Sequence, residues 1–120
     1  MPTLQSRMPD TLAQVKVPYV DYGNQSTVVY SDDYMFLPAE KEVFGTPTRS
    51  PAAEADALTQ FAYYKNGGSK IKNFSGSEDY WWLRSVDDYY SGDFCLVTSS
   101  GYASYNNASD SNGAAPCFCV

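Results

Sequence analysis

Histidine is absent from this 120-residue chain, and positive charge is scarce. Without histidine, the chain lacks the commonest general acid–base group, the usual activator of a nucleophile and a frequent metal ligand. Eight Lys and Arg stand against fourteen Asp and Glu, a net charge of −6, and no basic residue follows Arg84. This balance disfavours a phosphate-binding surface, so we expect no nucleic-acid partner.

Long apolar segments are also lacking. No run approaches the ~20 apolar residues of a membrane-spanning helix, so we expect no membrane insertion. Residues 1–20 mix Pro, Gln, Arg and Asp and carry no visible secretory signal. The expectation is a protein made in the cytoplasm that either stays there or leaves the cell as part of a particle.

Cysteine occurs only three times, at Cys95, Cys117 and Cys119, an odd number that disfavours a disulfide scaffold. On a strand, Cys117 and Cys119 would share one face with parallel side chains, a poor geometry for a bridge. Each cysteine lies beside Phe, Leu or Val, which favours buried thiols. A metal site made of these cysteines alone would lack a fourth ligand, and we expect no cofactor.

Tyrosine, by contrast, is abundant, with 11 Tyr beside 6 Phe and 2 Trp. The 43% of hydrophobic and 18% of charged residues are typical of a globular protein, and the length suits one domain. We predict an irregular N-terminal segment over residues 1–10 and a single domain over residues 11–120.

Two short helices are predicted in the middle of the chain. In the first, Pro38 suits the first helical position and Gly45 the end. In the second, Ser50 suits the N-cap, Pro51 the first turn and residues 66–69 the end. The apolar face of this second helix would hold Ala55, Leu58, Phe61 and Ala62.

Strands are predicted on both sides of the helices, over residues 11–17, 27–30, 80–85, 94–98 and 116–120. Tyr102–Ala115 consists almost wholly of Tyr, Ala, Ser, Asn, Asp and Gly. A disordered tail is the alternative for such a composition, but the apolar strand after it favours a loop held at both ends. The prediction is an α+β fold with a short antiparallel sheet, two short helices and long C-terminal loops.

Ordered blocks of the sequence carry a resemblance to a known family. They are Phe36–Gly45, Gln60–Tyr64, Tyr80–Ser85, Phe94–Val97 with Gly101, and Gly113–Cys119. These blocks resemble domain of unknown function 6273, whose pattern reads roughly FLPSE-x-EVFG, WWLRSP, F-C-x-V, G and G-V-x-P-x-F. The resemblance covers residues 8–120.

The chain departs from the family pattern at three points. Val86 stands where the family usually has Pro, and Ala114 stands where Val is usual. Family members commonly carry a further N-terminal strand, of which Thr3–Arg7 would be the remnant. The first two changes are apolar exchanges that should leave the fold intact. The third would remove a sheet edge, which either another chain supplies or the sheet tolerates losing.

The resemblance implies a fold and a setting. Leu37–Glu42 is similar to the helix start of the C-type-lectin-like fold of the formylglycine-generating-enzyme type. The closing Pro-x-Phe strand resembles the last strand of that fold. Family members occur in gut bacteria and their phages, which implies a place on a virion surface. Some related lectin-like proteins are targets of diversity-generating retroelements, and the composition of Tyr102–Ala115 fits such diversification.

In this fold the exposed C-terminal loops would form the ligand-binding surface. Tyr gives rigid contact area, and Ser, Asn and Gly give adaptable hydrogen bonds. The alternative is that the tyrosines only pack a loop-rich surface. The candidate ligand-binding residues are Asp88, Tyr89, Tyr90, Tyr102, Tyr105, Asn106, Asn107, Ser109, Asp110 and Asn112.

We therefore expect a non-catalytic module that binds a host-cell surface protein or glycan, displayed in several copies or as a homo-oligomer beside other virion proteins. The alternative is a virion decoration component without a ligand site. Structural roles are predicted for Trp81, Trp82, Leu83, Arg84, Gly101, Pro116 and Phe118. Arg84 would either clamp an acidic ligand group or pair with Asp79, Asp87, Asp88 or backbone carbonyls.

Metal binding and catalysis are the remaining alternatives. Asp87, Asp88, Asp93 and Asp110 offer oxygen ligands for Ca²⁺, but the Glu-Pro-Asn and Trp-Asn-Asp motifs of calcium-binding lectins are absent. Cys117 and Cys119 do not match the context of the copper-binding cysteines of formylglycine-generating enzymes. Glu78 and Asp79 are adjacent, so on a strand they would point to opposite faces. We expect neither a metal nor an enzyme.

Overall fold

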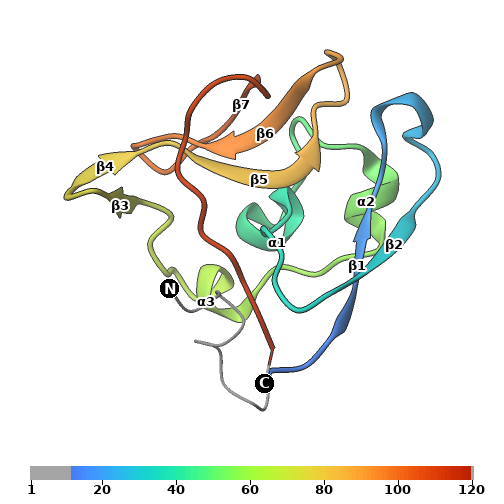
Figure 1. Ribbon diagram of the computed structural model, residues 1–120, viewed down its shortest axis with the longest axis horizontal. Coiled ribbons are helices and arrows are strands. Elements are labelled where there is room, and N and C mark those ends of the chain that lie inside the picture. Colours follow the sequence, from blue (N-terminus) through green and yellow to red (C-terminus); the bar gives the residue numbers. More distant parts are fainter. Residues whose placement is uncertain (1–11, 120) are drawn as a thin grey trace, which may run out of the picture.

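The computed structural model describes residues 12–119 (Figure 1). Residues 1–11 and 120, which include the predicted irregular segment and Thr3–Arg7, lie outside the described part. The strands are β1 (Val15–Tyr19), β2 (Val29–Asp33), β3 (Lys72–Phe74), β4 (Ser77–Asp79), β5 (Trp81–Val86), β6 (Asp93–Val97) and β7 (Ala103–Asn107). The helices are the 3-10 turn η2 (Tyr22–Asn24), α1 (Glu40–Phe44), α2 (Ala52–Asp56) and α3 (Ala62–Lys65).

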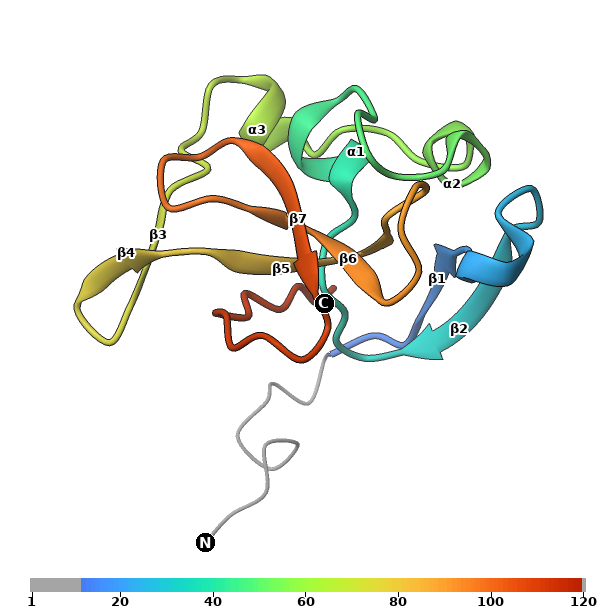
Figure 2. The same cartoon turned by 90° about the horizontal axis from the view of Figure 1, so that it is seen from above.

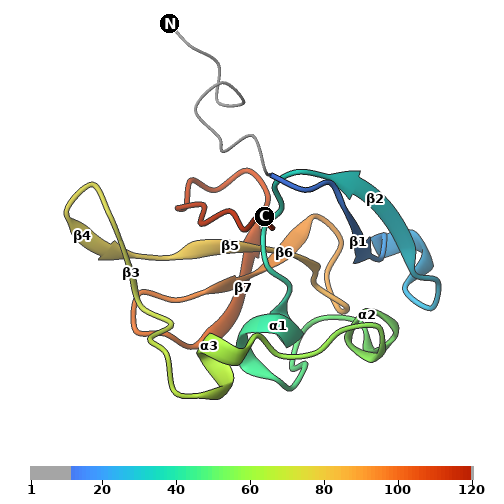
Figure 3. The same cartoon turned by 90° about the horizontal axis from the view of Figure 1, so that it is seen from below.

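The centre of the fold is an antiparallel sheet with strand order β5-β6-β7. Both turned views place α1, α2 and α3 on one face of this sheet and the chain after β7 on the other (Figures 2 and 3). The hairpins β1-β2 and β3-β4 lie on either side of it. The fold is thus a small mixed α/β domain with short antiparallel sheets and few helices.

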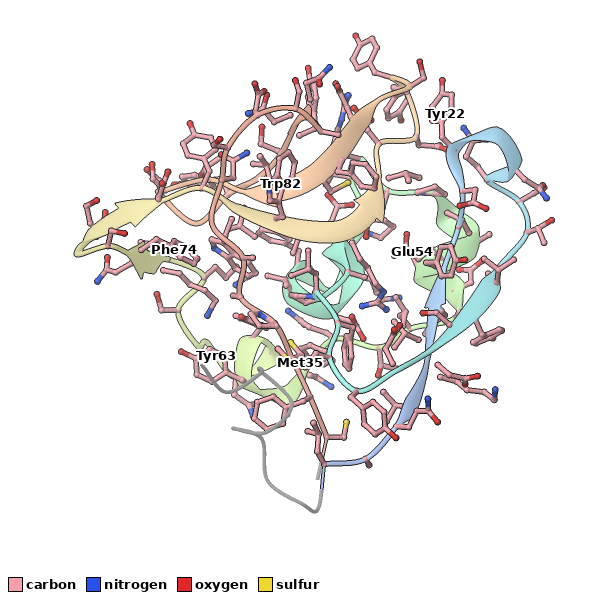
Figure 4. All side chains as sticks on the ribbon, viewed as in Figure 1. Tyr22, Met35, Glu54, Tyr63, Phe74 and Trp82 are labelled. Atoms are coloured by element: carbon pink, nitrogen blue, oxygen red, sulfur yellow. The ribbon has the colours of Figure 1, made fainter. Side chains whose placement is uncertain are left out.

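Alternation along β5 determines what each face of the sheet contains. Trp81 and Leu83 are fully buried and pack with Val43 of α1 and with Cys95 and Val97 of β6. Trp82 lies on the opposite face, where Figure 4 shows it against β5. The backbone N–H of Trp82 donates to the Gly113 carbonyl at 2.9 Å. The edge of β5 away from β6 is therefore paired with the C-terminal segment, which closes the sheet on that side.

The first helix forms close to where the sequence predicts it. Gly45 ends α1 with φ of +80°, a conformation that favours glycine. Pro38 is not its first helical residue, because the Glu42 carboxylate accepts from the N–H of Ala39 at 2.9 Å and makes Ala39 the N-cap. Proline therefore precedes the cap, and the helix proper has only five residues, less than one and a half turns.

The predicted second helix is two separate helices, α2 and α3. Tertiary hydrogen bonds replace the helical ones between them: Phe61 N–H donates to the Glu42 carbonyl at 2.8 Å. The Gln60 amide donates to the Val43 carbonyl at 2.9 Å. Pro51, rather than Ser50, is the N-cap of α2. The prediction of one helix was wrong because Gln60 and Phe61, at the break between α2 and α3, bond to α1 instead of continuing a helix.

The C-terminal region is more regular than predicted. Strand β7 lies inside the predicted loop Tyr102–Ala115. It pairs with β6 along its whole length, with Asn107 opposite Asp93 and Ala103 opposite Val97. The closing segment does not join this sheet: Cys117 pairs with Phe36, and Cys119 pairs with Ala13. It therefore links the C-terminal half of the domain to the N-terminal half.

The cysteines have three different environments, and all are free thiols. Cys95 is fully buried, Cys117 is half-buried and Cys119 is exposed. The prediction of buried thiols was thus wrong for Cys119, because the last pairing lies at the edge of the molecule beside Ala13. Among residues 12–119, no helix has the length and apolarity to cross a membrane.

A candidate binding surface built on Arg49 and three tyrosines

A buried carboxylate fixes the loop that carries the key cation of the candidate site. Glu40 opens α1 and is fully buried. Its Oε1 accepts from the backbone N–H groups of Thr48, Arg49 and Ser50 at 2.9, 3.1 and 3.0 Å. The Ser50 hydroxyl donates to the same oxygen at 2.8 Å. One side chain thereby satisfies three successive backbone donors and holds Arg49 in place.

Arg49 ties this loop to the loop between β5 and β6. Its Nη2 donates to the Asp87 carboxylate at 2.8 Å, and Asp87 is fully buried. The Arg49 carbonyl accepts from Asp88 N–H at 2.7 Å, and Asp87 also accepts from Tyr89 N–H at 3.1 Å. The two loops lie side by side at the end of the sheet where β5 turns into β6 (Figure 1).

Three tyrosine rings surround the Arg49 guanidinium. Its central carbon lies 3.8 Å from the ring centroid of Tyr105, 4.7 Å from that of Tyr89 and 5.4 Å from that of Tyr90. The rings of Tyr90 and Tyr105 are 5.8 Å apart. Cation–π attraction of this kind holds the rings in place. We call Tyr89, Tyr90 and Tyr105 the tyrosine surface.

The tyrosine surface remains open to solvent although it is anchored from below. Tyr89 is 62% exposed, Tyr90 54% and Tyr105 39%. The side chain of Arg49, in contrast, is only 24% exposed. The arrangement presents rigid aromatic faces whose order depends on a buried ion pair.

The structure brings together only part of the predicted ligand-binding set. Asp88 precedes the tyrosines, and the turn that carries Asn107, Ser109 and Asp110 adjoins the same loop, because Ala108 N–H donates to the Gly92 carbonyl at 2.9 Å. All four of these polar residues are exposed. They form a polar rim beside the tyrosine surface.

Three members of the predicted set lie elsewhere. Tyr102 is 71% exposed but precedes Ala103, which pairs with Val97 at the opposite end of β7. Asn106 is half-buried and faces the other side of the sheet, opposite Phe94. Asn112 is half-buried, and its amide nitrogen has no hydrogen-bond partner. The predicted surface is thus split between two ends and two faces of the β6-β7 hairpin.

Arg49, Glu40 and Asp87 belong to the candidate site, and the sequence did not reveal their part in it. Asp87 stands in the sequence as a possible calcium ligand or partner of Arg84, yet it pairs with Arg49. No periodicity or motif connects Arg49 to tyrosines in distant segments. The one available signal was an acidic residue at the start of a predicted helix, which ordinarily indicates capping rather than a loop anchor.

Arg84 follows one of its two predicted alternatives. Its guanidinium donates to the carbonyls of Pro18 and Leu37 at 3.0 and 2.9 Å, and to the Glu42 carboxylate. The predicted acidic partners were wrong, because Arg84 pairs with Glu42 and Asp87 pairs with Arg49. Glu42, from α1, takes that role and is itself buried.

The other residues with predicted structural roles divide in two. Trp81 and Leu83 are core residues, Trp82 is half-buried, and Gly101 takes a φ of +86° against Ile71. Pro116 is exposed, and Phe118 is 48% exposed. The pairings of Cys117 and Cys119 turn the Phe118 side chain between them outward.

The charges around the tyrosine surface define what it can bind. Asp88 and Asp110 are exposed beside it, whereas Arg49 is neutralised by Asp87. Its surroundings therefore favour uncharged or positively charged ligand groups. Within the described residues, no group of three or more Cys, Asp or Glu side chains converges as a metal site.

Burial alters the acidity of Cys95 and Glu54. Burial raises the pKa of the Cys95 thiol strongly, which makes it a poor nucleophile. Burial also raises the pKa of Glu54 from 4.5 to about 7, against the lowering effect of a hydrogen bond from Ser85. Glu78 and Asp79 are exposed on β4.

Comparison with known proteins places the chain in a family. No curated protein matches the chain, and no solved structure matches it. A family model described as Domain of unknown function (DUF6273) matches residues 1–120. The match spans both the tyrosine surface and the residues that anchor it. The chain belongs to the family of domain of unknown function 6273.

Proposed function

We propose that this protein is a non-catalytic binding module of C-type-lectin-like fold, carried on a phage particle, whose tyrosine surface binds a host-cell surface protein or glycan. The observation that carries the proposal is the Arg49 cluster. Three exposed tyrosine rings converge on one guanidinium that a buried carboxylate neutralises. A surface tyrosine with no ligand to meet has no need of such an anchor.

Pre-organisation is the physical advantage of this arrangement. A binding surface loses affinity when its side chains must be ordered on contact, by about 1 kcal/mol for each flexible side chain. The tyrosines are held before the ligand arrives, because they stack on Arg49. Asn107, Ser109 and Asp110 at the rim supply hydrogen-bonding groups to hydroxyls or amides.

A binding assay on intact cells tests this function. The protein is biotinylated, assembled on fluorescent streptavidin to gain avidity, and measured by flow cytometry on a panel of intestinal bacteria. We expect the double variant Tyr89→Ser/Tyr90→Ser to reduce cell binding at least about tenfold, as is usual when aromatic contacts at an interface centre are removed.

The matched control is Tyr30→Ser/Tyr34→Ser, which removes two tyrosines from the β1-β2 side of the molecule. Tyr30 is 59% exposed and Tyr34 46%, close to the 62% and 54% of Tyr89 and Tyr90. The control should bind cells as the unmodified protein does. Equal losses in both double variants would mean that general stickiness, not the tyrosine surface, holds the cells.

Diversification of this surface is a second part of the proposal. Deep sequencing of the gene across a population of source particles should find substitutions at exposed positions such as Tyr89, Tyr90 and Asn107. It should find none at the buried positions Asp87 and Leu96, although these lie within the same region. A uniform gene would end the diversification proposal and leave a fixed adhesin.

The alternative function is a virion decoration component in which copies of the chain cover one another's tyrosines. Sedimentation velocity separates the two. A protein that self-associates, and becomes a monomer in the Tyr89→Ser/Tyr90→Ser variant, would favour the decoration component. A monomer whose cell binding requires the tyrosines would favour the binding module.

A further inference from the structure

Carboxylates surround the tyrosine surface, and the backbone holds each of them beside it. Asp88 N–H donates to the Arg49 carbonyl at 2.7 Å, which fixes Asp88 directly before the first tyrosine. Asp93 lies opposite Asn107 in the β6-β7 pairing, and Asp110 N–H donates to the Asn107 carbonyl at 3.0 Å. Asp88 and Asp110 are exposed, and Asp93 is half-buried. Negative charge is thus built into the β5-β6 loop and into the turn after β7.

Few positive charges balance these three aspartates. The Arg49 guanidinium is already paired with Asp87, which is fully buried. Among residues 12–119, no salt bridge involves any of the three aspartates. No basic residue follows Arg84 in the sequence. The surface therefore attracts positively charged ligand groups and repels negatively charged ones.

The carboxylates are spread around the rings rather than gathered at one point. In the described part of the chain, no three Cys, Asp or Glu side chains converge as ligands of one metal ion would. A ligand that neutralises the aspartates therefore needs positive charges at separate positions along an extended molecule. A polymer with charged side groups meets this requirement, whereas a single small cation does not.

The tyrosine rings determine what lies between these charges. Arg49 already supplies a cation to all three rings, with its central carbon 3.8, 4.7 and 5.4 Å from their centroids. A second cation centred on the same rings gains less, because Arg49 already polarises them. The exposed parts of Tyr89 and Tyr90, 62% and 54% of each residue, are better covered by an uncharged C–H surface. We therefore expect a ligand with a flat, uncharged centre and positive charges at its periphery.

Hydroxyl groups fit the polar rim of the same surface. Oδ1 of Asn107 accepts from the N–H and from the hydroxyl of Ser109 at 3.0 and 2.8 Å, so the Asn107 amide is held in one orientation. Its NH₂ group is left to donate to a ligand oxygen. A sugar ring combines the three features that this surface requires: a flat C–H face, hydroxyl groups and a position for an amine.

We infer that the ligand of the tyrosine surface is a glycan whose sugars carry free, protonated amines. Its sugar rings lie on Tyr89 and Tyr90, and its amines pair with Asp88 and Asp110. Asp93 adds to the negative potential. A lysine- or arginine-rich protein segment would bring the charges without the flat C–H faces. The inference rests on the proposed function and names the class of ligand for the same surface.

Three oligomers separate the amine from the sugar ring: the hexamer of glucosamine, the hexamer of N-acetylglucosamine and hexalysine. Each is titrated into the protein at pH 6 and low salt by isothermal titration calorimetry. We expect the glucosamine hexamer to bind about tenfold more tightly than the N-acetylglucosamine hexamer, because each of two exposed ion pairs contributes about threefold. High salt should remove most of this advantage. Equal affinity for the two glycan hexamers would overturn the inference, and hexalysine that binds as tightly as the glucosamine hexamer would assign the surface to a basic protein segment instead.

The two exposed aspartates provide the variant, and β4 provides its matched control. Asp88→Asn/Asp110→Asn should keep the fold, because both side chains are exposed, and should bind the two glycan hexamers equally. Glu78→Gln/Asp79→Asn removes the same net charge from exposed positions of β4, which Figure 1 places away from the β5-β6 loop, and should keep the tenfold preference. Equal losses in both variants would contradict the inference, because the preference would then reflect the net charge of the whole protein.

Failure of this inference is distinguishable from failure of the proposed function. Tyr89→Ser/Tyr90→Ser should weaken binding of the glucosamine hexamer about tenfold, in parallel with its effect on cell binding. Unchanged affinity for the hexamer in this variant would show that charge alone holds it and would contradict the inference. Cell binding that requires the tyrosines, in a protein that does not bind the glucosamine hexamer, would end the amine-bearing glycan and leave the binding module standing.

Discussion

Arg49 shows how one side chain can determine both the charge and the shape of a surface. Its guanidinium neutralises a fully buried Asp87 and stacks three tyrosine rings. Arginine suits this position because its planar group stacks on rings while it donates from its edge, which lysine cannot do. The tyrosine surface is therefore only as ordered as the ion pair beneath it.

Replacing Arg49 by Met should destabilise the protein by about 3 kcal/mol, because the buried Asp87 would lose its charged partner. Adding Asp87→Asn removes the unpaired charge and should recover more than half of that loss. Urea denaturation of the two variants and the unmodified protein measures the difference. A double variant less stable than Arg49→Met would show that the ion pair is not the origin of the loss.

Glu54 makes stability depend on pH. Its pKa is raised from 4.5 to about 7 in the folded state, so protonation of the Glu54 carboxylate stabilises the folded protein. The contribution of Glu54 to the free energy of unfolding is complete below pH 4.5. It is lost as pH rises through 7, a change of about 3 kcal/mol. Glu54→Gln should therefore be more stable than the unmodified protein at pH 8 and similar to it at pH 4.5.

Thermal denaturation across this pH range provides the measurement for Glu54. The neighbouring Glu42, which has a cation in Arg84, offers a contrasting variant. Glu42→Gln should lose stability at pH 8, because it removes the charged partner of the largely buried Arg84. Parallel pH profiles for Glu54→Gln and the unmodified protein would assign the pH dependence to other groups.

At the level of elements, the sequence predicts the helices and strands whose own residue pattern is sufficient to identify them. β5 and β6 follow from apolar and aromatic alternation, and α1 follows from its terminal glycine. β7 was missed because its residues, Ala-Ser-Tyr-Asn-Asn, have little apolar content, and its pairing with β6 supplies the order. The split between α2 and α3 depends on bonds to α1 that no local pattern reveals.

The β3-β4 hairpin, also missed, turns through Ser75 and Gly76 with φ of +54° and +87°. This geometry is that of a type I′ turn, in which Asn-Gly is the favoured pair. Ser75→Asn should stabilise the protein by about 0.5 kcal/mol, and Ser75→Ala should destabilise it by a similar amount. Urea denaturation orders the three proteins; a stabilising alanine would contradict the turn assignment.

At the scale of the whole molecule, the candidate site unites segments that are far apart in sequence. Arg49 comes from the loop before α2, Tyr89 and Tyr90 from the loop after β5, and Tyr105 from β7. Composition identified the tyrosines because their number is unusual. It could not identify Arg49, whose place depends on bonds to Glu40 and Asp87. It could not separate Tyr102 from the others either, because that follows from the register of β6 with β7.

The pairing of Ala13 with Cys119 joins the two ends of the described chain, with a hydrogen bond of 2.8 Å. A disulfide here would close nearly the whole domain into one loop. Ala13→Cys, oxidised with Cys119, should raise stability by about 4 kcal/mol over its reduced form. Melting with and without dithiothreitol measures this, with Ala13→Ser as the control that should not respond. An unchanged melting temperature would contradict the pairing.

The pairings of Ala13 with Cys119 and of Phe36 with Cys117 also determine how the domain responds to tension. The first and last described residues lie together, away from the β5-β6 loop (Figure 1). A pull on both ends loads the Ala13–Cys119 and Phe36–Cys117 hydrogen bonds first and opens them one after another. The C-terminal segment would then peel from β5 at Gly113. Under load it acts as a strap that yields before the loops around Arg49 are disturbed.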